Sequence, residues 1–232
     1  MRRVHVSVPL PEGVYDALRG IKRGMRRGES GARDLSGDRE IEWSWVAARI
    51  PDGPGAALDF GCGEGPLGLV AARRGFDVTA VDLGAVAWAF RHRRLAFVQG
   101  DILDLPLASA SFDLVLNCST VEHVGLAGRY GVTESRTDGD LAAMARLRSL
   151  MKRGALMLLT IPVGTDAVFP PWHRVYGPER LPRLLEGFSV EHREYWLKDA
   201  QNRWVESGES DALGAPSREQ LYGLGCFCLR NP

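Results

Sequence analysis

The chain has 232 residues, 45% of them hydrophobic, with 29 basic and 29 acidic side chains and a formal net charge of +0. This length can bury a core without metals or disulfides, and the balanced charge excludes a global field that would attract nucleic acid or an anionic membrane. With no Cys-x-x-Cys pair among its four cysteines, and no long apolar run, we expect a cytoplasmic protein with reduced thiols, no membrane span and no signal peptide.

Residues 1–35 carry a local excess of basic side chains, which suits either an arm for a phosphorylated partner or a solvated lid. A helix is predicted over residues 41–50, with Ser36 and Asp38 as candidate N-cap residues, because apolar side chains recur there at helical spacing. Trp43 and Trp45 on this helix either pack in the core or close over a ligand. We expect residues 1–50 to form an N-terminal arm and leading helix, and residues 51–232 to form the main domain.

From residue 56 onward, short apolar runs alternate with helical stretches. Strands are predicted over 56–60, 77–82, 95–99, 112–117, 155–161, 188–197 and 221–229, and helices over 66–74, 85–93, 141–152 and 179–186. Gly154 is the expected C-cap of helix 141–152, and Pro162 is expected to end strand 155–161. This alternation demands a mostly parallel sheet, in which ligands bind beyond the carboxyl ends of the strands.

The first strand runs into the loop Asp59-Phe60-Gly61-Cys62-Gly63-Glu64-Gly65. Its glycines allow a tight turn and let a ligand touch the main chain, although loops that merely turn share this pattern. Asp82 ends the second strand about 20 residues after Gly61, where a carboxylate can accept both ribose hydroxyls of an adenosine. The alternative for Asp82 is the N-cap of helix 85–93.

The third strand runs into Gly100-Asp101-Ile102. At this position Asp101 can accept a hydrogen bond from an adenine amino group while Ile102 packs on the ring. The alternative for Asp101 is a simple turn residue.

Several motifs, taken in order, resemble the motif series of class I S-adenosylmethionine (SAM)-dependent methyltransferases. They are the loop 58–65, Val81-Asp82, Gly100-Asp101-Ile102, and the runs 105–107 and 111–116. The resemblance implies an α/β, Rossmann-like fold whose seven-stranded, mostly parallel sheet has the order 3-2-1-4-5-7-6, with an antiparallel last strand and flanking helices. It implies SAM as cofactor, S-adenosylhomocysteine as product, and the amino-acid end of SAM at the glycine loop. The expected cofactor-binding residues are Asp59, Gly61, Cys62, Gly63, Asp82, Leu83, Asp101, Ile102, Asn117 and Cys118.

Glu64 separates this interpretation from dinucleotide binding. An NAD site places a pyrophosphate at a helix N-terminus, where a carboxylate would repel it, whereas the cationic methionine part of SAM tolerates that charge. An NAD-type oxidoreductase and a non-catalytic SAM-binding partner protein remain the alternatives. The Asn-Cys-Ser-Thr run at residues 117–120 argues against methylation of nucleic-acid bases.

Candidate residues for the acceptor side follow the fourth and fifth strands. The candidate catalytic residues are His123, His173 and Tyr176, and the candidate substrate-binding residues are Arg129, Tyr130, Asp166 and Arg174. His123 suits a general base, or a histidine bonded to the main chain beside SAM. The alternatives are salt bridges to Asp138 or Asp140 for the arginines and packing for the tyrosines. Trp172 is a candidate wall of the acceptor pocket.

Three runs resemble a sparsely characterised branch of the same superfamily, often labelled only as a domain of unknown function. They are Ser119-Thr120-Val121-Glu122-His123-Val124-Gly125, Gly128-Arg129-Tyr130-Gly131 and His173-Arg174-Val175-Tyr176-Gly177. The polar lining favours transfer of a methyl group to an oxygen or nitrogen of a small polar acceptor, such as a sugar, a natural product or a related metabolite. No metal is expected, because the ligand spacings of metal sites are absent. The sequence leaves the oligomeric state open.

Overall fold

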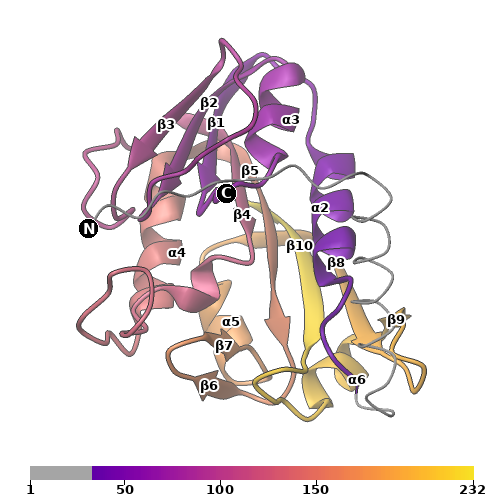
Figure 1. Cartoon of the computed structure of the whole chain (residues 1–232). Helices are drawn as coiled ribbons and strands as arrows, with labels where there is room; N and C mark the ends of the chain where they lie inside the picture. The colour runs from indigo at the N-terminus through magenta and orange to yellow at the C-terminus, as the bar shows by residue number, and fades with distance from the viewer. Residues whose placement is uncertain (1–32) are drawn as a thin grey trace, which may run out of the picture.

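The computed structural model describes residues 33–232, so most of the basic arm expected over residues 1–35 lies outside the described part (Figure 1). One sheet of eight strands runs through the fold in the order β3-β2-β1-β4-β5-β10-β8-β9. The strands are β1 (Gly55–Phe60), β2 (Phe76–Asp82), β3 (Leu95–Gln99), β4 (Phe112–Cys118), β5 (Met151–Val163), β8 (Ser189–Lys198), β9 (Trp204–Ser207) and β10 (Gly223–Arg230). The first five are parallel, and β10, β8 and β9 are each antiparallel to the strand before them in this order.

The α/β, Rossmann-like architecture is confirmed, but the predicted seven-strand sheet is wrong. β9 adds an eighth strand at the edge, because the chain turns back after β8 and pairs Tyr195 with Ser207 and Lys198 with Trp204. β6 (Ala167–Phe169) and β7 (His173–Val175) form a separate two-stranded sheet. This small hairpin lies directly after β5, where the acceptor residues were expected.

Helices cover both faces of the large sheet. α2 (Asp38–Arg49) and α3 (Leu67–Arg73) pack on one face, and α4 (Gly139–Leu150), α5 (Arg180–Leu184) and α6 (Glu209–Gly214) contribute to the core on the other. In β5, Met157 and Leu159 face the second of these cores and Leu158 faces the first, as the alternation of a strand requires. Figure 1 shows α2 and α4 on opposite sides of the sheet.

The predicted helix over residues 85–93 is wrong, since residues 85–94 form an irregular segment. The indole N–H of Trp88 donates to the carbonyl of Gly63 at 2.9 Å, and its ring stacks on Phe90 with centroids 5.4 Å apart. These contacts with the glycine loop override the local helical pattern. The N-cap alternative for Asp82 therefore fails, because no helix follows it.

Three boundary details also differ from expectation. Gly154 does not cap helix α4, which ends at Leu150; it lies inside β5 at a φ of 76°, where the β4–β5 register shifts. Pro162 does not end β5, which runs on to Val163. Neither Ser36 nor Asp38 is the N-cap of α2, because Gly37 occupies that position with a left-handed backbone conformation. Between residues 33 and 232, no helix has the length and hydropathy that a membrane crossing requires.

Candidate functional site

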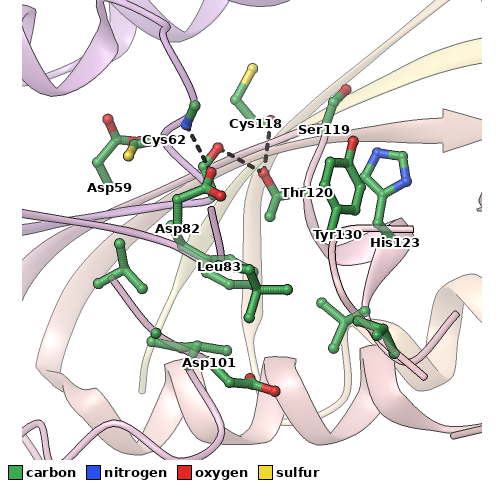
Figure 2. Close-up of a pocket in the computed structure, with 18 of the residues that line it drawn as sticks. Asp59, Cys62, Asp82, Leu83, Asp101, Cys118, Ser119, Thr120, His123 and Tyr130 are labelled. Atoms are coloured by element: carbon green, nitrogen blue, oxygen red, sulfur yellow. Dashed lines mark hydrogen bonds between the residues drawn. The ribbon is translucent and has the colours of Figure 1, made fainter. Parts of the chain in front are cut away.

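A cavity of about 560 Å³ lies at the carboxyl ends of β1, β2, β3 and β4. This is the edge at which a parallel sheet binds its ligands, and the volume is in the range of small-molecule sites. Figure 2 shows Asp59, Cys62 and Asp82 on one side of the view and Ser119, His123 and Tyr130 on the other. The lining includes Arg39, Trp43, Asp59, Gly61, Cys62, Gly63, Glu64, Asp82, Leu83, Asp101, Ile102, Cys118, Ser119, Thr120, His123 and Tyr130.

Gly61 and Gly63, both in the loop after β1, have different surroundings. A Cβ on Gly61 would lie 2.0 Å from Cγ2 of Thr120, so packing alone demands glycine there. A Cβ on Gly63 would meet nothing within 4 Å, and its φ is 46°. The space beside Gly63 is therefore empty, so a ligand can approach the loop closely at this residue.

Asp82 shapes the turn after β2 with both carboxylate oxygens. Oδ2 accepts the N–H of Gly63 at 3.0 Å, and Oδ1 accepts the N–H of Gly84 at 3.0 Å. Each carboxylate oxygen has a further lone pair, so Asp82 can also accept two ligand hydroxyls. Asp101 accepts the N–H of Leu103 at 3.0 Å and lies next to Ile102 in the cavity wall.

Asp59, Cys62 and Cys118 also line this cavity. Asp59 is buried, which raises its pKa to about 7, and it accepts a main-chain hydrogen bond from Gly68 in α3. Burial also raises the pKa of the Cys62 and Cys118 thiols, so both stay protonated. Asn117 is the exception among the predicted cofactor residues. It is fully buried with its amide against Sδ of Met144 and is not part of the cavity wall, so its predicted contact is wrong.

These residues fit SAM. The empty space beside Gly63 suits the amino-acid end, the carboxylate of Asp82 suits two ribose hydroxyls, and the Asp101–Ile102 pair suits an adenine with one polar edge and two apolar faces.

A second cavity of about 200 Å³ adjoins the first. Four residues line both cavities and so form their common border: Arg39, Ser119, His123 and Tyr130. The other lining residues of the second cavity are Leu35, Asp38, Glu122, Arg129, Trp172, His173, Glu219, Gln220 and Tyr222.

His123 stands on this border in a fixed orientation. Its Nδ1 lies against the carbonyl oxygen of Trp172, so Nδ1 carries the proton and donates it. Nε2 lies 3.6 Å from Oε1 of Glu122 and keeps its lone pair. Burial lowers the pKa of His123 to about 4, so the imidazole is neutral at pH 7.

Two buried glutamates beside the border were not singled out from the sequence. Glu42 on α2 is 1% exposed and accepts hydrogen bonds from Ser119, from Thr160 at 2.9 Å and from Arg39 at 3.1 Å. Glu122 is 2% exposed, and its Oε2 has no partner within the described residues. Burial raises the pKa of Glu42 to about 7 and that of Glu122 to about 8. The sequence signal that could indicate a buried Glu42 is its position three residues before Trp45, on the same side of the helix as this buried side chain.

Three predicted acceptor-side residues are turned away from both cavities, and their predicted roles are wrong. Tyr176 is fully buried and donates its hydroxyl to Asp140 at 3.1 Å. Arg174 is 1% exposed and donates to main-chain carbonyls, including those of Val124 and Thr137. Asp166 accepts the main-chain N–H groups of residues 177, 179 and 180. Each satisfies buried or turn polar groups and so fixes the loops around the site.

The other predicted acceptor-side residues do line the second cavity. They are His123, Arg129, Tyr130 and His173. His173 is buried, with Nε2 lacking a partner among the described residues, and burial lowers its pKa to about 4. Arg129 lies over the ring of Tyr130, 4.5 Å from its centroid, and 5.2 Å from that of Trp172. Trp45, in contrast, packs in the core. No three His, Cys, Asp or Glu side chains in residues 33–232 gather as metal ligands would.

Two family models match the chain. The one described as a methyltransferase domain matches residues 57–134, and the one described as a Caenorhabditis protein of unknown function, DUF268, matches residues 102–203.

A ubiquinone biosynthesis O-methyltransferase of Caulobacter sp. (strain K31) is 31% identical over 177 residues, which span 66% of this chain and 68% of that protein. The corresponding enzyme of Caulobacter vibrioides (strain ATCC 19089 / CIP 103742 / CB 15) is 30% identical over 71% of this chain and 72% of its own length.

Among solved structures, the fold is similar to that of the Burkholderia thailandensis 1,6-didemethyltoxoflavin-N1-methyltransferase, which was crystallised with S-adenosylhomocysteine. The TM-score is 0.55 at 17% identity, over 98% of this chain and 93% of that one.

Proposed function

The chain belongs to the SAM-dependent methyltransferases, and from that premise we propose that it methylates an oxygen or nitrogen atom of a small polar acceptor. The observation that carries this proposal is the border between the two cavities, at Ser119, His123 and Tyr130. SAM supplies an electrophilic methyl group on a sulfonium sulfur and leaves as S-adenosylhomocysteine. Methyl transfer is a displacement at carbon, so holding donor and acceptor in line supplies much of the rate.

The larger cavity is the proposed cofactor site. Asp82 would accept the ribose hydroxyls, Asp101 would accept from the adenine amino group, and Ile102 would pack on the ring. The main-chain N–H groups of Gly61 and Gly63 are donated to Val81 and Asp82, so the carbonyl oxygens of the two glycines would accept from the ammonium group of the amino-acid end. Arg39 lines the same cavity from α2 and would offset the carboxylate of that end.

His123 and Glu122 are the proposed route for the acceptor proton. Nε2 of His123 has a lone pair because Nδ1 donates to Trp172, and Oε1 of Glu122 lies 3.6 Å from Nε2. The low pKa of His123 makes the imidazole alone a weak base, whereas an ionised Glu122 beside it would stabilise the imidazolium. The two side chains therefore work best as a pair when Glu122 has lost its proton.

The leading helix is the proposed cover of the cofactor. Arg39 and Trp43 of α2 line the cavity, while Trp45 and Val46 of the same helix are buried in the core. We assign α2 to this covering role and residues 51–232 to the catalytic domain.

Calorimetric titration tests the function. Wild type should bind SAM and not NAD, and Asp82→Ala should lose most of the SAM affinity. Asp77→Ala is the matched control, since Asp77 lies on the same strand with its exposed side chain paired to Arg94. Equal SAM affinity in wild type and Asp82→Ala would show that the cofactor is placed wrongly.

A further inference from the structure

The second cavity combines exposed aromatic faces with polar groups. Trp172 is 41% exposed and Tyr130 is 50% exposed, although both are large aromatic residues, and both line this cavity. Tyr222 lines it as well, with its ring edge-on to His173 at 4.8 Å. Aromatic side chains left exposed around a concavity are typical of a surface that a ligand covers.

Several polar groups here have no partner in the part of the chain that the structure describes. Within residues 33–232, the guanidinium of Arg129 forms no hydrogen bond or ion pair and is held only by the rings of Tyr130 and Trp172. Nε2 of His173 and Oε2 of Glu122 are buried and unpartnered in the same part of the chain. Buried polar groups are nearly always hydrogen-bonded, so these orphaned atoms indicate a ligand that supplies several donors and acceptors.

The charges in the cavity do not favour an acceptor with strong net charge. Arg39 is already paired with the carboxylate of Glu42, and both histidines are neutral at pH 7. Arg129 lines the same cavity as the half-buried Asp38 and the exposed Glu219, so the cavity has no excess of positive charge. A neutral ligand rich in hydroxyl groups suits this mixture better than a phosphate or a plain phenol, because each polar side chain can meet one of its hydroxyls.

We propose that the acceptor is a sugar ring, stacked on Trp172 and hydrogen-bonded through its hydroxyls to Arg129 and His173. This inference rests on the proposed function and narrows its acceptor to one class. The hydroxyl to be methylated faces Ser119 and His123 at the border. Its oxygen forms the new C–O bond as the methyl–sulfur bond breaks, the electron pair of that bond stays on sulfur, and the proton passes to Nε2 of His123.

The test measures formation of S-adenosylhomocysteine with two panels of acceptors. The first holds hexoses, 6-deoxyhexoses and their neutral methyl glycosides, and the second holds catechol and 4-hydroxybenzoate. At least one sugar should be methylated, and Trp172→Ala and Arg129→Met should each lower kcat/KM for it by about tenfold or more, with SAM affinity unchanged. Trp172→Tyr, which keeps an aromatic face, should retain most of the activity.

Val168→Ala is the matched control, because Val168 is exposed on the neighbouring strand β6 and lines neither cavity. If wild type binds SAM but neither binds nor methylates any sugar, the sugar assignment is overturned and the proposed function still stands. The same holds if only phenols are methylated, or if both variants turn over the sugar as wild type does. If wild type does not bind SAM, the proposed function itself is overturned.

Discussion

The carboxylate of Glu42 accepts a hydrogen bond from the hydroxyl of Ser119, 77 positions later in the chain. This bond ties helix α2 to the end of β4 at the border between the two cavities. Ser119 has a φ of 46°, which is uncommon for a residue other than glycine and costs conformational energy. The same carboxylate also pairs with Arg39, so one buried group orients two side chains that line both cavities.

Replacing Glu42 should therefore loosen the site as well as the fold. Glu42→Ala leaves Arg39, Ser119 and Thr160 without their shared acceptor, and we expect a loss of roughly 3 kcal/mol in the free energy of unfolding, measured by urea denaturation. SAM affinity should fall too, because Arg39 is released. Glu40→Ala, at an exposed position of the same helix, should change neither quantity. Equal stabilities of the Glu42 and Glu40 variants would contradict this account.

The two loop glycines should respond differently to a methyl group. Gly61→Ala should destabilise the fold, because the new Cβ would lie 2.0 Å from the side chain of Thr120. Gly63→Ala meets no atom within 4 Å, so it should cost only the strain of a positive φ, about 1 kcal/mol. Its main effect should be weaker SAM binding. Thermal melts and calorimetry separate the two outcomes, and a Gly63→Ala protein with wild-type SAM affinity would count against the proposed contact.

The methylation rate should rise with pH. Burial raises the pKa of Glu122 to about 8, and the His123–Glu122 pair can accept the acceptor proton best once Glu122 is ionised. The kcat of wild type should therefore increase as the pH rises through about 8. His123→Ala should lower kcat, and Glu122→Gln should remove this rise, because glutamine does not titrate. A kcat that stays level between pH 6 and pH 9 in wild type would refute the paired role.

The same pKa predicts how stability depends on pH. Because the folded-state pKa of Glu122, about 8, exceeds the ordinary value of 4.5, its stabilising contribution is complete below pH 4.5 and is lost as the pH rises through about 8. Glu122→Gln removes this loss. The melting temperature of the variant relative to wild type should thus be higher at pH 9 than at pH 5. An identical difference at both pH values would mean that Glu122 is ionised at pH 5 in the folded state.

The central strands were predictable because strands buried on both faces read as continuous apolar runs, and their carboxyl ends then locate a ligand edge. That logic predicts Asp82 and Asp101 at the ligand edge, and both line the cavity. It failed for residues 85–93, where Trp88 bonds to Gly63 from a distant part of the chain. Local patterns carry no record of such contacts.

The acceptor side was less predictable because a loop position does not tell which way a side chain points. Tyr176 and His173 are three residues apart, yet Tyr176 turns to the buried Asp140 and His173 turns to the second cavity. The burial of Glu42 is hard to predict for another reason. An acidic residue in a helix is usually solvated, and only the packing of α2 on the sheet makes this one buried.

A crystal structure with bound S-adenosylhomocysteine tests the central claim most directly. The ribose hydroxyls should meet the carboxylate of Asp82, and the sulfur should face the border of Ser119, His123 and Tyr130, with the second cavity open beyond it. A sulfur directed away from that border, or a ribose held by groups other than Asp82, would contradict the account.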